Sequence, residues 1–407
     1  MLAAPKAPKG LSAGVRWSGD RMEATTVPLS DPEPGEVELL EAAGLDAARW
    51  AVDEDTVRAS VWQQQVDGYL TWLRAFRFEP VRRDSGRAVK RDELEAQAVA
   101  LLDGWVPETV PPEWVSGGGD AFAVFLSDWQ LGKDEGDGLT GDAPGTVGAV
   151  ARVRRMIDKV HARILGLRES GRPCERLYVF LLGDLVEGCD GFYAQQSFRA
   201  DRDRRSQVRL VRRLLIDALK VWAPLFGETV VAVVAGNHGE NRKDGKSFTT
   251  FADNDDVAVV EQVADVFELG GHPLADRIRW AIPEDRLHLT IDVAGIPLGI
   301  AHGHQLTGGG KKHSGTKARD YWAEQAFGLD ALADARLFVT AHFHHFTTTQ
   351  YAAEKDGPGR WHFQTPAEDG GSAWWRELSG QSASSATLTM RVGSGLPLGW
   401  ADLELIA

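Results

Sequence analysis

Short, mostly apolar runs separated by amphipathic segments dominate the chain from about residue 120 onwards. Continuous runs of this kind are typical of strands buried on both faces, whereas residues 204–222 repeat apolar positions every three or four residues, as a helix does. The runs are AFAVFL, LYVFLL, TVVAVVA, IPLGIA and ARLFVTA, which begin at residues 121, 177, 229, 296 and 335. The alternation predicts a layered α/β domain that places ligands at the carboxyl ends of its strands.

The first hundred residues follow a different pattern. Residues 1–35 are rich in Pro, Gly, Ser and Asp without a sustained period, so we expect a flexible arm there. Residues 36–45 have helical spacing, and two strand-like runs then flank Asp67-Gly68, a strong hairpin signal. We therefore expect a small α+β accessory domain of a helix and a hairpin over residues 36–104.

The second strand of this expected hairpin carries aromatic residues on one face. Trp72, Phe76 and Phe78 share that face with Arg74 by the period of two, and several Lys and Arg residues follow at 82–91. Aromatic rings next to basic residues favour contact with nucleic acid, through stacking and phosphate binding. The alternative is that the aromatic rings pack the hairpin on its helix and the charges are solvated. Both interpretations stay open.

Composition narrows the class of protein. Of the 407 residues, 43% are hydrophobic and 26% are charged, which favours a globular protein with more than one domain, and the net charge of −14 argues against a protein that coats nucleic acid over its whole surface. No apolar run approaches the roughly 20 residues that span a bilayer, and the first residues lack the apolar core of a signal peptide. We expect a cytoplasmic protein that does not contact membranes. The two cysteines, Cys174 and Cys189, predict no disulfide framework.

Polar residues with the chemistry of metal ligands follow each of the five apolar runs. One histidine at a strand end is more often structural than catalytic, but five polar strand ends together favour a shared site. In chain order these residues are Asp128 and Gln130, then Asp184, then Asn237 and His238, then His302 and His304, and finally His342, His344 and His345.

The segments SDWQ, GDLVEG, GNHGE, AHGH and TAHFHH, in this order and about 40 to 65 residues apart, resemble the motifs of the calcineurin-like metallophosphoesterase superfamily. Within it they are most similar to the DNA-repair nucleases of the SbcD type and related phage-encoded phosphoesterases. The resemblance implies a four-layered αββα sandwich with two mixed sheets. It makes residues 120–350 the catalytic domain, preceded by a Pro/Gly-rich linker at 105–119, and we expect residues 351–407 to add edge strands and loops.

The resemblance also implies a role for each strand-end residue. Two divalent ions, roughly 3.5 to 4 Å apart, clamp a phosphate and supply a bridging hydroxide as nucleophile in such sites. Asp184 would bridge both ions, and His238 would act as general acid or stabilise the leaving oxygen. The first ion would be bound by Asp128, Gln130 and His344, and the second by Asn237, His302 and His342. Mixed oxygen and nitrogen ligands suit Mn²⁺, with Mg²⁺, Fe²⁺ or Zn²⁺ as substitutes.

Gln130 stands where the family usually has a histidine. Its side chain coordinates only through a neutral carbonyl oxygen, which is a weaker donor to a first-row metal than imidazole. We hypothesise that the first ion is held weakly while the second site is intact. The harsher interpretation is a pseudoenzyme that retains the fold as a binding module.

Several neighbours of the expected ligands receive supporting roles. Glu187 is expected to hydrogen-bond a site residue rather than to bind metal, and His304 either does the same or contacts substrate. His345 either contributes in the same way or packs behind its strand. The segment GGGKKHSG lacks the residue order of a phosphate-binding loop, so Lys311 and Lys312 are candidates only for contact with substrate phosphates.

Taken together, these features predict a two-metal phosphodiesterase, with DNA as the expected substrate of a nuclease activity. Seven arginines between residues 199 and 213 form the densest basic segment, and some of them are candidates for a nucleic-acid path. The enzymatic alternative is a phosphatase or cyclic-nucleotide phosphodiesterase that acts on a small molecule, and the non-enzymatic one is a nucleic-acid-binding or assembly protein. A homodimer and an ATPase partner are expected from the resemblance alone.

Overall fold

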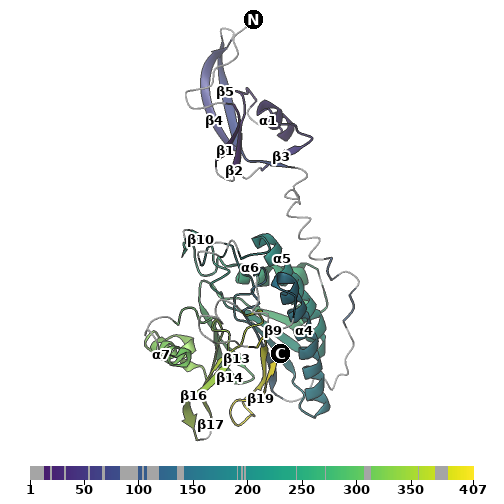
Figure 1. Cartoon of the computed structure of the whole chain (residues 1–407), viewed down its shortest axis with the longest axis vertical. Helices are drawn as coiled ribbons and strands as arrows, with labels where there is room; N and C mark the ends of the chain where they lie inside the picture. The colour runs from purple at the N-terminus through teal and green to yellow at the C-terminus, as the bar shows by residue number, and fades with distance from the viewer. Residues whose placement is uncertain are drawn as a thin grey trace. The chain divides into compact units, whose positions relative to one another are not determined.

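The computed structural model describes residues 13–407 apart from 19–20, 32–33, 54–55, 67–68, 83–99, 103–104, 108–118, 135–141, 190, 194–195, 197–198, 244, 271, 307–312, 356 and 372–383. The chain forms two compact units, Met1–Ala98 and Val99–Ala407. Figure 1 shows the helices and strands of both.

An antiparallel sheet with the strand order β1-β2-β5-β4 forms the N-terminal unit. Its strands are β1 (Gly14–Ser18), β2 (Arg21–Thr25), β4 (Arg58–Val66) and β5 (Tyr69–Phe78); the unit also has helix α1 (Glu36–Ala42) and the short pair β3 (Trp50–Val52) and β6 (Pro80–Arg82). We expected a flexible arm over residues 1–35. This expectation is wrong for Gly14–Ser18 and Arg21–Thr25, because these residues form the strands β1 and β2. These strands are too short to be evident from the sequence. β1 pairs with β2, β2 pairs with β5, and Ala24 of β2 is buried against α1.

The aromatic residues of β5 divide between two environments. Phe76 and Phe78 pack with α1 in the core of this unit. Trp72, on the same strand, is 54% exposed. The packing interpretation therefore applies to the two phenylalanines, while nucleic-acid contact by Trp72 stays a prediction. The basic residues at 83–91 lie outside the described residues.

Two mixed sheets build the second unit. The first has the order β12-β9-β8-β7-β18-β19 and the second the order β13-β14-β15-β17-β16. The first consists of β7 (Ala121–Leu126), β8 (Arg176–Leu181), β9 (Glu228–Val233), β12 (Ile278–Ala281), β18 (Thr387–Val392) and β19 (Trp400–Ile406). The second consists of β13 (His288–Val293), β14 (Ile296–Ala301), β15 (Leu337–Thr340), β16 (Thr347–Glu354) and β17 (Gly357–Gln364).

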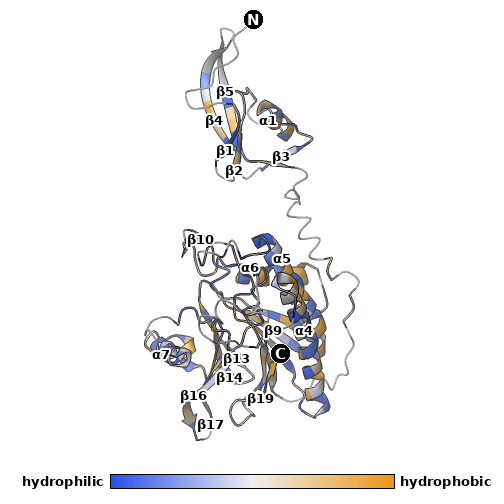
Figure 2. Ribbon diagram, viewed as in Figure 1, coloured by the Kyte–Doolittle hydropathy of each residue, from blue (hydrophilic) through white to orange (hydrophobic). Residues whose placement is uncertain are grey.

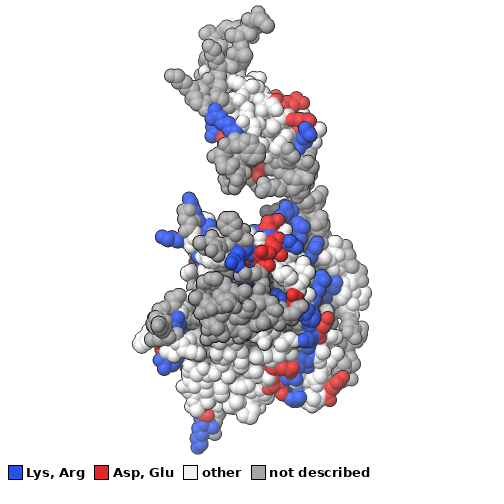
Figure 3. Space-filling model, in the orientation of Figure 1, with Lys and Arg blue, Asp and Glu red and all other residues white. Residues whose placement is uncertain are grey.

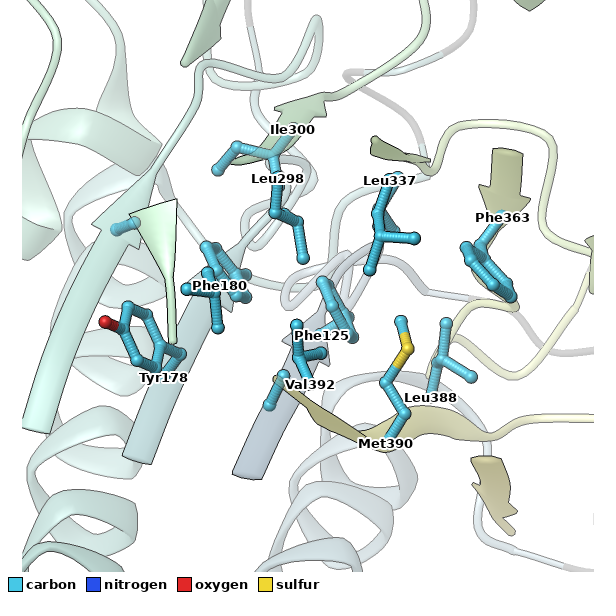
Figure 4. Packing of buried hydrophobic residues seen from close by; sticks show 14 of the residues in the cluster. Phe125, Tyr178, Phe180, Leu298, Ile300, Leu337, Phe363, Leu388, Met390 and Val392 are labelled. Carbon is cyan, nitrogen blue, oxygen red and sulfur yellow. The ribbon is translucent and has the colours of Figure 1, made fainter. Parts of the chain in front are cut away.

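The main hydrophobic core lies between these two sheets. Phe125 and Phe180 of the first sheet and Leu298 and Leu337 of the second belong to one buried cluster (Figure 4). The residues that alternate with these along the strands, such as Val179, face the other side of the sheet. They pack against α5 (Arg204–Trp222) and α6 (Asp255–Leu269). Because each strand is covered on both faces, the apolar runs are continuous rather than alternating.

Helices cover the outer faces of both sheets. Beside α5 and α6, the first sheet carries α4 (Gly145–Glu169), joined to α5 by a hydrogen bond from Trp222 Nε1 to the carbonyl of Ile157. Helix α7 (Ser314–Phe327) covers the second sheet, where Trp322 packs on Phe338. In Figure 2 the exposed sides of these helices carry hydrophilic residues. The unit is thus a four-layered αββα sandwich, as expected.

The C-terminal part contributes more than the edge strands that were expected of it. β17 and β18 lie inside their sheets, whereas β16, which ends at Glu354, and β19 are edge strands. Met390 of β18 is fully buried between the sheets, so the last segment of the chain completes the core. Within the described residues, no helix is long and apolar enough to cross a membrane.

Candidate metal centre

The two sheets bring their polar strand ends to one edge of the sandwich. β7, β8 and β9 are parallel neighbours, and so are β14 and β15, so the residues that follow these strands converge. The sheets meet where His302 Nε2, after β14, lies 3.0 Å from Asp184 Oδ2, after β8. The shared site predicted from the strand ends therefore exists as a cluster of side chains.

Asp184, His302 and His342 form the tightest part of this cluster. Each offers one ligand atom, and these atoms all lie within 4.8 Å of one another. His302 Nε2 is also 3.1 Å from Asn237 Oδ1 and 3.2 Å from His342 Nδ1. The ring of His302 is oriented from behind, because its Nδ1 donates a 2.6 Å hydrogen bond to the carbonyl of Leu182.

This donor set fits a divalent cation. With Nδ1 of His302 bound to a carbonyl, Nε2 faces a carboxylate, an amide oxygen and a second ring nitrogen, all of which are electron-rich. A proton on Nε2 satisfies one of these partners, whereas one cation accepts lone pairs from all of them. Asp184, Asn237, His302 and His342 are therefore the residues that would hold a metal ion.

The charges within the cluster shift several pKa values. Burial alone would lower the pKa of His302, but the carboxylate of Asp184 outweighs it and raises the pKa to about 9. Burial would raise the pKa of Asp184, yet His302 and His238 hold it below its usual range. Burial and the neighbouring His302 lower the pKa of His342 to about 4, so that ring is neutral and able to bind metal at neutral pH.

Five of the predicted ligands adopt a left-handed backbone that side chains rarely tolerate. The φ angles are +51° at Asp128, +43° at Gln130, +54° at Asp184, +69° at His342 and +57° at His344. Only four other non-glycine residues in the described part of the chain have a positive φ. Strain of this kind persists where the surroundings enforce it and concentrates at functional sites.

Asp256, which the sequence did not single out, holds the loop of Asp184 in place. Its buried carboxylate accepts hydrogen bonds from the backbone N–H groups of Asp184 at 2.9 Å, Leu185 at 2.9 Å and Gly236 at 3.1 Å. Burial and the nearby Asp184 raise its pKa to about 7. The sequence does not mark Asp256 as a site residue, because an acidic residue in the first turn of a helix is ordinarily a solvated capping residue.

His238 lies at the side of this cluster, with its ring fixed by Glu187. Nδ1 of His238 is 2.9 Å from the carbonyl of Glu187 and 3.3 Å from its Oε2, while Tyr193 Oη donates to Glu187 Oε1 at 2.7 Å. Burial would lower the pKa of His238, but Asp184 and Glu187 raise it to about 9. The side chain is 9% exposed, and Nε2 lies 3.9 Å from Asp184 Oδ2. The expected supporting role of Glu187 agrees with this geometry.

The residues predicted for the first ion are arranged differently. Asp128 Oδ1 lies 3.2 Å from His344 Nε2, whose Nδ1 is 3.4 Å from Asp369 Oδ1. Gln130 Oε1 accepts a 3.1 Å hydrogen bond from Lys133 Nζ, and the Gln130 amide nitrogen is 3.4 Å from His238 Nε2. Lys133 and Asp369 were not among the predicted residues. No sequence pattern connects them, since 236 positions separate them along the chain.

The remaining candidates lie further from the cluster. Burial and the charge of His302 lower the pKa of His304 to about 3, and its Nε2 is 3.8 Å from Glu240 Oε1. His345 Nδ1 hydrogen-bonds the carbonyl of Phe343 at 2.7 Å, within its own loop. Lys311 and Lys312 lie outside the described residues.

No family model matches the sequence, and no curated protein matches it. Among solved structures, the chain is similar to a conserved uncharacterized protein from Streptococcus pneumoniae TIGR4 that is described as a predicted phosphoesterase. The two are 12% identical with a TM-score of 0.27, and the match covers 68% of this chain and 85% of that one. It is also similar to Vps29 from Chaetomium thermophilum, with 9% identity and a TM-score of 0.29 over 66% of this chain and 83% of that one. Vacuolar Protein Sorting 29 from Cryptosporidium parvum has 12% identity and a TM-score of 0.29 over 71% of this chain and 98% of that one. Similarity at this level does not bear on activity, and the layer order stands on the strand pairings described above.

Proposed function

We propose that the chain is a metal-dependent phosphodiesterase of the calcineurin-like metallophosphoesterase superfamily and that it cleaves DNA. The metal-dependent part of this proposal is supported by the convergence of Asp184, His302 and His342 within 4.8 Å, with Nε2 of the carbonyl-bound His302 ring turned towards the carboxylate. The order of the motifs SDWQ, GDLVEG, GNHGE, AHGH and TAHFHH supports the superfamily.

A bound divalent ion supplies charge for the phosphate oxygens and lowers the pKa of a water molecule. Residues of the chain around the ion orient the reacting groups and supply a proton. The backbone N–H of His238 donates to Asp184 Oδ1 at 2.8 Å, which fixes His238 beside the carboxylate. Glu187 fixes the ring of His238 and favours its protonated form. We propose that His238 donates a proton to the leaving oxygen.

The arginines of α5 support a polyanionic substrate. Arg205, Arg209 and Arg213 recur every four residues, so they lie on one side of the helix at intervals of about 6 Å. Within the described part of the chain, no carboxylate lies within 4 Å of them, although Asp203 at the N-cap feels the charges of Arg205 and Arg209. Arginines spaced in this way repel one another, which costs stability in a protein of net charge −14.

Helix α5, which carries the stripe of Arg205, Arg209 and Arg213, contacts the segment that follows Asp184. In the first turns of α5, Gln207 accepts a 2.8 Å hydrogen bond from the N–H of Gly188 in the GDLVEG segment. Arg204 binds both oxygens of Asp255, the residue before Asp256. Figure 3 shows Lys and Arg side chains gathered over α4 and α5. This placement favours DNA over a small phosphodiester, because only a polymer reaches along the stripe.

The activity is tested by incubating the full chain with Mn²⁺ and labelled linear, circular and single-stranded DNA, beside bis-p-nitrophenyl phosphate and cyclic nucleotides. We expect DNA cleavage that is lost in His302→Ala. Hydrolysis of the small diesters alone would contradict the choice of DNA, and no hydrolysis of any substrate would contradict a phosphodiesterase.

The arginine stripe is tested by DNA affinity as a function of salt. Each phosphate contact contributes about 0.9 to the slope of log affinity against log salt, so replacing the three arginines by Gln should reduce the slope by about 2.7. The matched control replaces Lys317, Arg319 and Lys355 by Gln, which removes the same charge at positions outside α5. Equal slopes for both triple variants would show that the stripe does not bind DNA.

A further inference from the structure

Lys133 places a positive charge beside Gln130, one of the residues predicted to bind the first ion. Its Nζ is 3.1 Å from Gln130 Oε1 and 2.5 Å from Asp369 Oδ2, and its side chain is 13% exposed. The backbone N–H of Lys133 bonds the carbonyl of Gln130 at 3.0 Å, which closes the turn that aims the side chain back at Gln130. The ammonium is therefore a built part of the site rather than a surface charge.

Of the two partners of Lys133, Gln130 is among the residues predicted to bind the first ion, and Asp369 is not. Gln130 Oε1 is the only atom through which this side chain binds a metal, and it already accepts from the ammonium. Asp369 also reaches His344, which in turn faces Asp128. A divalent ion bound to Gln130 Oε1 would lie within a few ångströms of the Lys133 charge and be repelled by it.

The two halves of the site thus differ in kind. Around His302 the described residues present only electron-rich atoms to a shared point, and no ammonium or guanidinium lies among the atoms that converge there. Around Gln130 a permanent positive charge is already present and is paired with Asp369. The replacement of histidine by glutamine and the presence of Lys133 are consistent with each other, because a neutral amide oxygen accepts from an ammonium and a metal-binding imidazole does not.

We propose that the chain binds one divalent ion, at Asp184, His302 and His342, and that the Lys133 ammonium replaces the other ion as a fixed positive charge beside Gln130. This inference rests on the proposed function, since it concerns the metal centre of the same site. It replaces the expectation of two ions with one ion and one lysine. Lys133 acts as a positioning residue, which neutralises Asp369 and orients the Gln130 amide.

The proposal is tested by counting metal ions on the full chain. The protein is stripped with a chelator and titrated with MnCl₂, and bound Mn²⁺ is measured by calorimetry and by electron paramagnetic resonance. We expect one ion per chain in the wild type and in Lys133→Arg, which keeps the charge. The double variant Gln130→His with Lys133→Met should bind two. Lys317→Met, which removes a lysine from α7, should bind one.

Each outcome decides a separate question. Two ions in the wild type would overturn the proposal whatever the variants do, and so would a folded double variant that binds one. If the double variant fails to fold, two ions in Lys133→Arg would also overturn it, because the charge is retained there. A wild type that binds no Mn²⁺ would overturn the metal centre itself, and with it the proposed function. One ion that persists in His302→Ala would place the ion elsewhere and contradict the assignment.

Discussion

Replacing Asp256 with Asn should weaken the support of the Asp184 loop while leaving the shape of the side chain nearly unchanged. The carboxylate accepts two backbone N–H groups on Oδ2, from Asp184 and Gly236, and one on Oδ1, from Leu185. An amide has one acceptor oxygen. In its better orientation the Asn oxygen keeps the two bonds on the Oδ2 side, and its NH₂ group then faces the N–H of Leu185.

The cost follows from these contacts. At pH 8, above the pKa of about 7 of Asp256, its carboxyl is ionised. One buried N–H, that of Leu185, then loses its acceptor and meets a donor, which costs about 1–3 kcal/mol, and the two remaining bonds lose the strength that a charged acceptor gives. We therefore expect the free energy of unfolding to fall by about 2–4 kcal/mol. Because Asp184 holds a left-handed φ of +54° against strain, the loosened loop should also lower the affinity for Mn²⁺.

The assay is urea unfolding of the chelator-treated protein, followed by Mn²⁺ titration. Asp265→Asn is the control, since it makes the same change at an exposed position of the same helix. If Asp256→Asn unfolds at the same urea concentration as the control and binds Mn²⁺ as tightly as the wild type, the carboxylate does not support the loop and the reasoning fails.

Two further substitutions test other parts of the account. Burial raises the pKa of Glu368 to about 7 from an ordinary 4.5. Between pH 4.5 and 7 the folded state therefore binds more protons than the unfolded state. The stability that Glu368 contributes below about pH 4.5 is lost as the pH rises through 7. Glu368→Gln should therefore match the wild type at about pH 4 and exceed it by up to about 3 kcal/mol at pH 8 in urea unfolding. A difference that does not change with pH would contradict this. Gly183→Ala should destabilise the chain by more than about 2 kcal/mol, because φ is +86° and a Cβ atom would lie 2.5 Å from the backbone nitrogen of Gly236. Its control is Gly171→Ala, where φ is +74° but nothing lies within 4 Å, and equal losses of thermal stability would show that the close approach is unimportant.

The strands of the sandwich were predictable from the sequence where both faces are buried. The run at 121–126 is entirely buried in β7, so its continuous apolar pattern reflects its environment directly. β1 and β2 were not predictable, because strands of five residues at one side of a small sheet carry little pattern of their own. The interior position of β18 depends on pairing with β7, which is more than 260 residues away, and the local pattern does not contain that information.

The candidate site shows the same division. Asp184, His302 and His342 were predictable because they stand at strand ends, and the parallel pairing of the strands brings such ends together. Asp256 acts through backbone N–H groups, and Lys133 acts through Asp369, so neither has a motif that marks it. What the sequence lacks is thus the set of contacts that orient the ligands, rather than the ligands themselves.

The most direct test of the central claim is a crystal of the full chain grown with Mn²⁺ and measured at a wavelength where manganese scatters anomalously. We predict an anomalous peak bound by Asp184, His302 and His342, at the roughly 2.0–2.2 Å expected for oxygen and nitrogen ligands of a first-row metal. No peak at this position at millimolar Mn²⁺, or a peak bound only by other residues, would contradict the assignment of this cluster as the metal centre.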